Sequence, residues 1–425
     1  MKSLTGIKEN APSYSRVDQM TPFRPDFVPE TISALKEKAA QVYAQSNALA
    51  VCAKGLSAKS IERLVTGVSC YYTNVMEGNV TTPIEIERAL SESTCGGHSR
   101  KLRDLARAHI DASLWAKEKP IKLNLSQLDS WIREAHERLY TQDMDERCEP
   151  GSFRNYQVAV GIHEAVDHKA IPQFIEKLDN VYKLNKDKPL ESLIDMFCLH
   201  HRLMWVHPFG DGNGRVGRLL LQSCLESTID GANLWSVSRG YARDNAGANY
   251  KGALNNADMP RNGDYDGRGN LSTRQLAEFV DFSFDCALDQ IGFMRKTLDM
   301  DGIKDRVVLA LSLLVGAERA APMAKIFTMC MQNGQMGRGD LLLTTGLPER
   351  TARNQLSYLL KTGFLKGVSQ KGEVYAALPV PALGYLMPNL YPTAALPALS
   401  EVNLIASSDI DGLTRIERAA KGPGI

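Results

Sequence analysis

The chain has 425 residues, a length that favours two or three domains over a single core. Its hydrophobic content of 44% and charged content of 23% are those of an ordinary globular protein, and a formal net charge of +1 provides no global attraction to nucleic acid or anionic membranes. No secretory signal and no apolar run of about 18 residues is visible, so no membrane partner is expected. Eight scattered cysteines without a C-x-x-C pair favour reduced thiols and a cytoplasmic protein.

The first 300 residues predict mostly helices. Residues 1–29 contain four prolines and few periodic apolar positions, which indicates an extended N-terminal arm. Apolar residues then recur at spacings of three and four, which predicts a helical region over 30–120 and a second one over 121–300. Within the latter, Phe153–Gly161 alternates in polarity and ends in glycine, which predicts a short β-hairpin. Because strands are few, the predicted fold class is mainly α.

A change of character after residue 300 indicates a separate C-terminal module. Predicted helices span 307–317, 323–331 (begun by Pro322), 340–345 and 349–362, and predicted hairpin strands span 364–368 and 373–378. Helix, turn, helix and hairpin is the order of a winged helix-turn-helix domain, assigned to 301–390, with a tail over 391–425. The basic face of its last helix is modest, so we favour dimerisation or target docking over DNA binding.

The stretch from His207 to Arg218 reads H-P-F-G-D-G-N-G-R-V-G-R and carries the most chemistry in the chain. Its glycines let the backbone approach an anion, and a helix beginning near Asn213 would direct its positive end to the same point. Arg215 and Arg218, three residues apart, share one helical face. Asp211 is a hard oxygen ligand suited to Mg²⁺, and His207 is a candidate general base. The pattern therefore favours transfer chemistry on a metal-bound polyphosphate.

Each residue of this stretch also has an ordinary structural explanation when it is taken alone. Asp-Gly and Asn-Gly are common turn dipeptides, and a single histidine is more often structural than catalytic. The complete set within twelve residues is what favours a nucleotide site.

The stretch is similar, at every position, to the Fic family signature H-P-F-x-[D/E]-G-N-G-R-x-x-R. This resemblance implies a helical Fic core that transfers AMP from ATP, with Mg²⁺, to a Ser, Thr or Tyr hydroxyl of a target protein. His207 would deprotonate that hydroxyl, Asp211 would hold Mg²⁺, and Phe209 would anchor the loop. Doc-like kinases of the superfamily carry lysine in place of Gly214, and the glycine leaves room for the ATP orientation of AMP transfer. The implied nucleotide-binding residues of the loop are His207, Asp211, Gly212, Asn213, Gly214, Arg215, Val216, Gly217 and Arg218.

An upstream segment, Thr73–Asn79, resembles the family's inhibitory motif [S/T]-x-x-x-E-[G/N] and falls in an expected helix at about 66–79. The resemblance implies that Glu77, itself beside the nucleotide, pairs with Arg218 and withdraws it from the γ-phosphate. A sheltered pair of this kind is worth about 1.5–3 kcal/mol. A solvated helix residue is the alternative for Glu77 taken alone.

Two further segments resemble the family's target and nucleotide contacts. The predicted hairpin falls where the family has its flap, a strand edge that clamps a target segment by main-chain pairing, and a plain surface hairpin is the alternative. Tyr250 resembles a residue near the adenine pocket, although a core position is equally open, and Lys251 stands where relatives often have a second tyrosine. The flap residues are Val158, Ala159, Val160 and Gly161.

Taken together, the residues and the resemblance predict a self-inhibited protein AMP-transferase. Its expected partners are ATP, a target protein and, through the C-terminal module, a second copy of the chain. Two alternatives stay open. One is a hydrolase that removes AMP from a modified protein, and the other is a nucleotide-sensing, DNA-binding transcription regulator.

Overall fold

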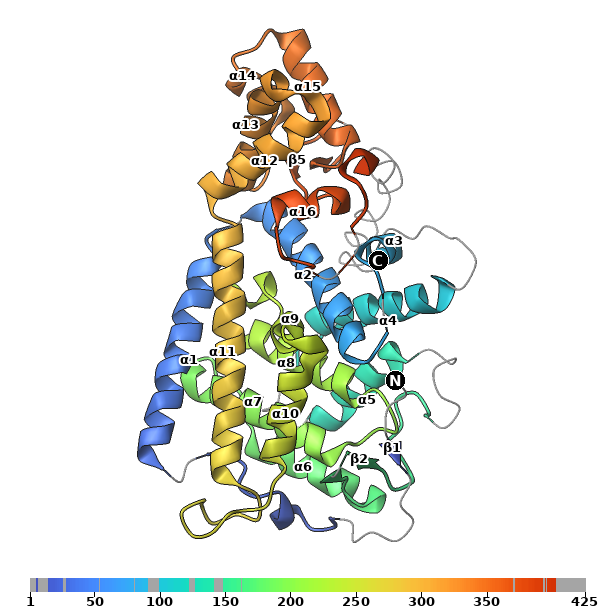
Figure 1. Cartoon of the computed structure of the whole chain (residues 1–425), viewed down its shortest axis with the longest axis vertical. Helices are drawn as coiled ribbons and strands as arrows, with labels where there is room; N and C mark the ends of the chain where they lie inside the picture. The colour runs from blue at the N-terminus through green and yellow to red at the C-terminus, as the bar shows by residue number, and fades with distance from the viewer. Residues whose placement is uncertain are drawn as a thin grey trace, which may run out of the picture. The chain divides into compact units, whose positions relative to one another are not determined.

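The computed structural model is mainly helical, as the sequence predicts (Figure 1). It describes residues 5–6, 14–25, 28–52, 54–79, 81–90, 99–121, 127–140, 148–161, 163–369, 371–392, 394 and 396–402. Residues 1–4, 7–13 and 26–27 of the predicted arm and residues 393, 395 and 403–425 of the predicted tail lie outside this part. Within the described residues, no helix combines the length and hydropathy that a membrane span requires.

The described helices and strands follow in chain order. The helices are α1 (Pro29–Leu49), α2 (Gly55–Met76), α3 (Pro83–Leu90), α4 (Ser99–Glu118), α5 (Leu128–Leu139), α6 (Ile171–Val181), α7 (Pro189–Val206), α8 (Asn213–Thr228), α9 (Val237–Ala242), α10 (Ala248–Ala257), α11 (Thr273–Thr297), α12 (Met300–Val315), α13 (Ala317–Asn333), α14 (Arg338–Thr344), α15 (Glu349–Lys361) and α16 (Leu383–Leu386). The strands are β1 (Thr5–Gly6), β2 (Ala159–Val160), β3 (His163–Glu164), β4 (Leu365–Gly367) and β5 (Val374–Ala376).

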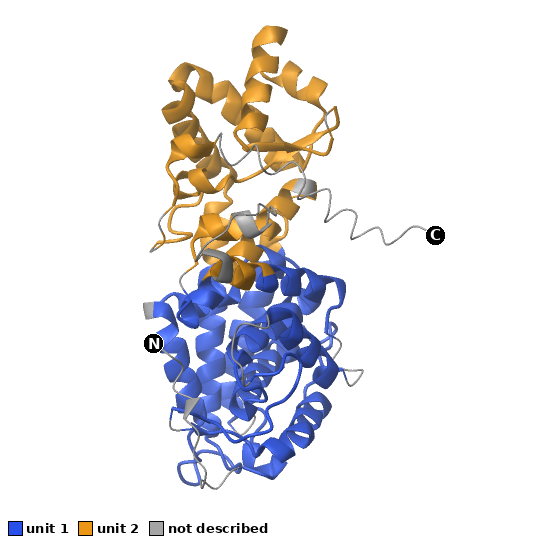
Figure 2. Cartoon of the chain, turned by 90° about the vertical axis from the view of Figure 1, so that its right-hand side faces the viewer, with its two compact units in different colours: residues 1–47, 72–79, 108–291 blue, residues 48–71, 80–107, 292–425 orange. Residues whose placement is uncertain are grey.

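Two compact units make up the chain, and each is assembled from segments that are distant in sequence (Figure 2). Unit 1 comprises residues 1–47, 72–79 and 108–291. Unit 2 comprises residues 48–71, 80–107 and 292–425. The helices α2 and α4 therefore each contribute residues to both units.

The helices α7 and α8 form the centre of unit 1. Pro189 begins α7 at a position where a missing N–H costs nothing, and the helix is buried along most of its length. α7 packs against α6, α8 and α10, while α5 packs against α6 and α8. The loop between α7 and α8 is therefore held by the unit's core, which includes the fully buried Phe174, Phe197 and Trp205.

The predicted hairpin at Phe153–Gly161 forms later in the chain and is shorter than expected. Its strands are β2 and β3, so residues 153–157 are not a strand. The physical reason is Arg154, whose main-chain N–H donates to Pro208 O at 2.9 Å and whose buried guanidinium binds further carbonyl oxygens. These bonds hold the backbone in a loop. A third strand, β1, pairs with β2 and was not predicted.

In unit 2, the C-terminal helices and hairpin occur in the predicted order. α14 and α15 are followed by the antiparallel pair β4–β5, whose register joins Leu365 to Ala376. The predicted start of a helix at Pro322 is wrong, because α13 begins at Ala317 and Pro322 lies inside it. The alanine-rich segment before the proline favours helix strongly enough to tolerate one lost hydrogen bond. The winged helix-turn-helix assignment stays a prediction.

Ser57, near the start of α2, joins three parts of unit 2. Its buried hydroxyl lies 2.9 Å from the carbonyl oxygens of Cys330 and Gly334, at the end of α13. It also accepts the Ala376 N–H of β5 at 3.2 Å. One hydroxyl thus satisfies main-chain groups from two separate elements.

Ser57→Ala should lower the free energy of unfolding by about 1–3 kcal/mol, because buried main-chain groups lose their partner. Urea titration followed by circular dichroism measures this change. Ser60→Ala, on the same helix but half-buried, is the matched control and should cost less than about 0.5 kcal/mol. Equal effects of the two substitutions would contradict the joining role of Ser57.

Candidate functional site

The loop between α7 and α8 is shaped by two left-handed residues. His207 follows α7 with φ 50° and ψ 61°, and its N–H still donates to Leu203 O at 3.1 Å. Gly212 has φ 83° and precedes α8, whose first N–H groups point toward the loop. A Cβ at Gly212 would lie 2.3 Å from the Tyr140 ring, so both the conformation and the available space require glycine.

Asn213 stabilises the loop through two side-chain hydrogen bonds. Its side-chain oxygen accepts the Phe209 N–H at 2.9 Å, and its amide donates to Phe209 O at 2.8 Å. The Phe209 ring is fully buried and stacks on His136 with a centroid separation of 4.0 Å. Both polar atoms of the Asn213 side chain are therefore engaged within the loop, and a contact with phosphate from this residue stays a prediction.

Arg154 ties the flap region to the loop, and sequence reasoning did not single it out. Its guanidinium is buried and donates to His207 O at 2.8 Å and to Tyr156 O at 2.9 Å. It also donates to Val166 O, just after β3. Burial lowers the pKa of Arg154 to about 10, which leaves it charged at neutral pH. The catalytic candidate His207 is thus positioned by a cation that binds its carbonyl oxygen.

The His207 side chain, on the first residue of the loop after α7, is half-buried. Burial, together with the neighbouring Arg154 and His163, lowers its pKa from 6.5 to about 4. The imidazole is therefore neutral at physiological pH and able to accept a proton. This protonation state is the one that a general base needs.

Asp211 and Arg215 face each other beside the helix start. Asp211 Oδ1 accepts the Gly212 N–H at 2.6 Å, and Oδ2 lies 3.7 Å from an Arg215 guanidinium nitrogen. The Asp211 side chain is 44% exposed, so its oxygens are accessible. Among the described residues no cluster of three or more metal-binding side chains occurs. A single accessible carboxylate fits Mg²⁺ that is bound mainly through nucleotide phosphates and water.

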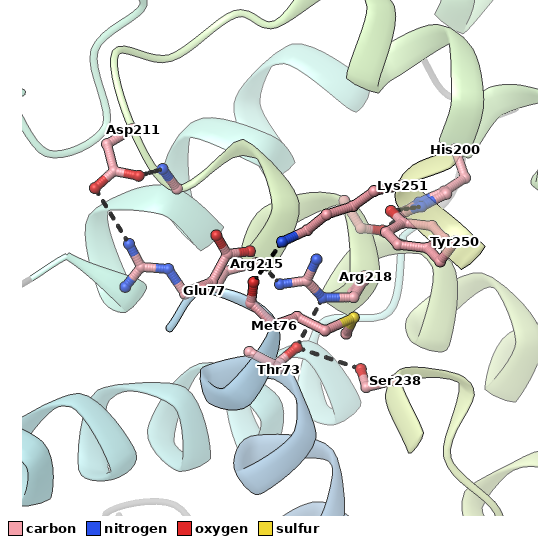
Figure 3. Close-up of polar contacts among 12 residues, drawn as sticks. Thr73, Met76, Glu77, His200, Asp211, Arg215, Arg218, Ser238, Tyr250 and Lys251 are labelled. Atoms are coloured by element: carbon pink, nitrogen blue, oxygen red, sulfur yellow. Dashed lines mark hydrogen bonds and ion pairs between the residues drawn. The ribbon is translucent and has the colours of Figure 1, made fainter. Parts of the chain in front are cut away.

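Glu77 and Arg218 form an ion pair directly behind the loop (Figure 3). Glu77 Oε1 lies 2.5 Å from an Arg218 guanidinium nitrogen, and Arg218 Nε donates to Thr73 Oγ1 at 2.8 Å. The Thr73 hydroxyl in turn lies 3.3 Å from that of Ser238 on α9. The motif threonine and glutamate therefore hold the same arginine, whose side chain is only 3% exposed.

The charge of Glu77 is stabilised by its surroundings. Burial by itself would raise the pKa of this carboxyl, but the charge and hydrogen bond of Arg218, with Arg215 and Lys251, lower it below the ordinary value. A group with a lowered pKa keeps its ion pair at neutral pH and loses it only in acid. A Cβ at Gly214 would lie 2.5 Å from Glu77 Oε1, so this glycine also leaves room for the carboxylate.

Lys251 binds the end of α2, the helix that precedes Glu77. Its ammonium donates to Met76 O at 2.9 Å (Figure 3). Met76 is the last residue of α2, and Glu77 follows directly. The carbonyl end of a helix attracts a cation, so Lys251 fixes the helix end from which Glu77 reaches Arg218.

Tyr250 lies in the core of unit 1 and is 1% exposed. Its hydroxyl lies 2.8 Å from His200 Nε2, and His200 Nδ1 lies 3.1 Å from Gly217 O. Because a carbonyl only accepts, Nδ1 carries the proton and Tyr250 donates to Nε2. Burial raises the pKa of Tyr250 to about 12, although the charge of Arg218 and its hydrogen bond act in the opposite direction. The predicted adenine contact of Tyr250 is untested, whereas its place in the core is observed.

The remaining predicted nucleotide residues fall into two places. Val216 is buried, and a Cβ at Gly217 would lie 2.4 Å from Met204 Cε, so Gly217 lies against α7. In the flap, Val158 and Ala159 are buried and Gly161 is exposed with φ 61°. The structure brings the loop and Glu77 together, while nucleotide contacts at all of these positions stay predictions.

Sequence reasoning missed Arg154 and the role of Lys251. No local pattern marks Arg154, because its partners lie on the flap and after α7. Lys251 carried a weak signal, since it replaces a tyrosine that relatives often have.

Comparison with known proteins agrees with the position of this site. Residues 126–225 match the model of the Fic/DOC family. A curated relative, "Protein adenylyltransferase Fic" of Nematostella vectensis, is 29% identical over 167 residues, which are 36% of this chain and 36% of that protein. The protein of the same name from Drosophila grimshawi is 29% identical over 162 residues, covering 36% of this chain and 32% of that protein. The chain thus spans about a third of the length of these relatives.

Similar solved structures include a Fic family protein from Desulfovibrio desulfuricans, with a TM-score of 0.49, 18% identity, and coverage of 83% of this chain and 98% of that one. The loop from His207 to Arg218 lies inside the segment that the family model matches. Residues 126–225 of this chain therefore carry a Fic/DOC domain.

Proposed function

We propose that this chain is a self-inhibited protein AMP-transferase, which moves AMP from Mg·ATP to a hydroxyl side chain of a target protein and releases diphosphate. The observation that carries the proposal is the juxtaposition at one loop of a neutral base, His207, and the first two turns of α8 with their two buried arginines. The names of the curated relatives support the same reaction.

In the proposed reaction, the imidazole of His207 accepts the proton of the target hydroxyl. The hydroxyl oxygen then forms a bond to the α-phosphorus, and the bond from that phosphorus to the bridging oxygen of diphosphate breaks. Arg215 and Arg218 hold phosphate oxygens, and the N–H groups at the start of α8 stabilise their charge. Asp211 would hold Mg²⁺, which supplies further neutralisation of the phosphate charge.

In the resting state, Glu77 takes the place of phosphate on Arg218. The 2.5 Å pair and the hydrogen bond that Arg218 donates to Thr73 support this part of the proposal. ATP then lacks one arginine contact until Glu77 withdraws. The chain should therefore have a low basal rate.

Glu77→Gly should raise self-modification about 10- to 100-fold, since a charge-assisted bond of about 1.5–3 kcal/mol is removed. His207→Ala in the Glu77→Gly background should lower it by about 10²–10⁴. Labelling is followed with ATP that carries the label at the α- or the γ-phosphorus. Only the α-label should be transferred.

Two matched variants serve as controls for this test. Glu149→Gln, at an exposed position, and His168→Ala, a partly exposed histidine, should label like their parents. Transfer of the γ-label would show that the reaction is phosphoryl transfer and not AMP transfer. Labelling that is unchanged by Glu77→Gly and by the added His207→Ala would refute the proposal.

The pH dependence should reflect the lowered pKa of His207. With a pKa near 4, the imidazole stays neutral as the pH falls from 8 to about 5, so kcat/KM of the Glu77→Gly variant should change little in this range. It should then fall as the pH approaches 4 and the base becomes protonated. An inflection near pH 6.5 would indicate an ordinary histidine and contradict this environment.

Lys251→Met should raise the basal rate, but by less than Glu77→Gly does. The substitution removes the bond to Met76 O while keeping the length of the side chain, so the end of α2 is held less firmly. A hydrogen bond of about 0.5–1.5 kcal/mol corresponds to an increase of about 2- to 10-fold. Lys186→Met, an exposed lysine, is the control, and equal rates of the two variants would show that Lys251 does not restrain Glu77.

A further inference from the structure

The flap strand β2 is the central strand of its sheet, and both of its edges are paired. β3 covers one edge, with Ala159 opposite Glu164. β1, from the N-terminal arm of the same chain, covers the other edge in an antiparallel register that joins Thr5 to Val160 and Gly6 to Ala159 (Figure 1). An extended segment can be added to a strand only where its main-chain groups are unpaired. A target segment that pairs with β2 therefore needs the edge that β1 occupies.

The chain that follows β1 is anchored beside the flap. Tyr14 O accepts the Asp167 N–H at 2.8 Å, directly after β3. The Tyr14 ring lies 4.6 Å from the Trp205 ring and is stacked at 6.0 Å on His163, a residue of β3. Further along, Thr21 O accepts the Leu271 N–H at 2.8 Å. The arm is thus attached to unit 1 close to the strand that it pairs with.

This anchor makes the pairing intramolecular. Residues 7–13 connect Gly6 to Tyr14, which is a short tether. A short tether gives an attached segment an effective concentration in the millimolar range. A target segment at micromolar concentration is then at a disadvantage against β1, even when its own affinity for the edge is the same.

We propose that the N-terminal arm is an intramolecular occupant of the target-docking edge, which an extended segment of a target protein must displace. The inference rests on the proposed function in one respect, namely that β2 is the strand that docks the target. It adds a second restraint that acts on the target rather than on ATP. Main-chain pairing accepts many target sequences, so the edge of β2 by itself discriminates little between targets. The arm would limit access to this edge.

The first test is direct and needs no catalysis. Hydrogen exchange is compared between the full chain and a variant that lacks residues 2–12 but keeps the Tyr14 anchor. The amides of residues 158–161 should lose protection in the shortened variant, while those of α7 and α8 stay unchanged. The double variant Thr5→Pro, Gly6→Pro should have the same effect, because proline donates no main-chain hydrogen bond. Its control, Thr5→Ala with Gly6→Ala, keeps both donors and should stay protected.

A labelled peptide with the sequence of residues 1–12 provides the second test. In fluorescence anisotropy it should bind the shortened variant saturably, and the full chain at least about tenfold more weakly. Lengthening the 7–13 tether about fourfold with glycine and serine should reduce this exclusion about eightfold, since effective concentration falls with roughly the 3/2 power of length. Unchanged exchange at residues 158–161 in both the shortened and the proline variants, or equal peptide binding by the full and shortened chains, would overturn the inference.

These outcomes are separable from the proposed function. Suppose that the shortened variant loses protection at residues 158–161 and binds the peptide, but that no AMP is transferred. The inference about the arm would then stand, and the proposed AMP-transferase activity would be refuted. If AMP is transferred but hydrogen exchange at residues 158–161 is the same with and without the arm, only the inference about the arm is refuted.

Discussion

Arg218 is a buried cation, and the arrangement of the site follows from the need to compensate it. Its side chain is 3% exposed, and its contacts include the Glu77 carboxylate and the Thr73 hydroxyl. A buried guanidinium that loses its anion is costly, so withdrawal of Glu77 favours whichever anion can replace it. Under the proposed function that anion is a phosphate of ATP. Under the same proposal, Arg218 is held by Glu77 in one state and binds the nucleotide in the other.

The loop itself is held in place by hydrogen bonds from neighbouring parts of unit 1. Arg154 binds the carbonyl oxygen of His207, and Asn213 binds both main-chain groups of Phe209. These bonds come from the flap side and from the first residue of α8, so the loop is fixed from two directions. Such fixing is what electrostatic catalysis requires, because donors that are already oriented need no rearrangement during the reaction. The two proposed restraints are Glu77, which occupies Arg218, and β1, which occupies the edge of β2. Both would limit the binding of a substrate, and neither breaks the hydrogen bonds that hold the loop.

Much of the local architecture was predictable from residue patterns. The apolar spacing of α7, the glycines after it and the start of α8 at Asn213 follow from short-range rules of helix formation and termination. The β-hairpin was predicted in kind but misplaced, because Arg154 imposes a loop through carbonyl groups that are distant in sequence. The prediction that a helix starts at Pro322 was wrong for a local reason. The alanine-rich segment before the proline is itself helical, and the helix continues through Pro322.

The sequence by itself determined the chemistry of the loop and the mainly helical class, since both depend on residue types at fixed short spacings. Only the tertiary structure decided which distant groups meet: Lys251 with the end of α2, Arg154 with His207, and the N-terminal arm with β2. It also decided that residues 48–71 and 80–107 belong with the C-terminal segment in one compact unit. The physical reason is that such pairings depend on complementary packing and on hydrogen-bonding groups that every residue carries, so they leave no periodic signal along the chain.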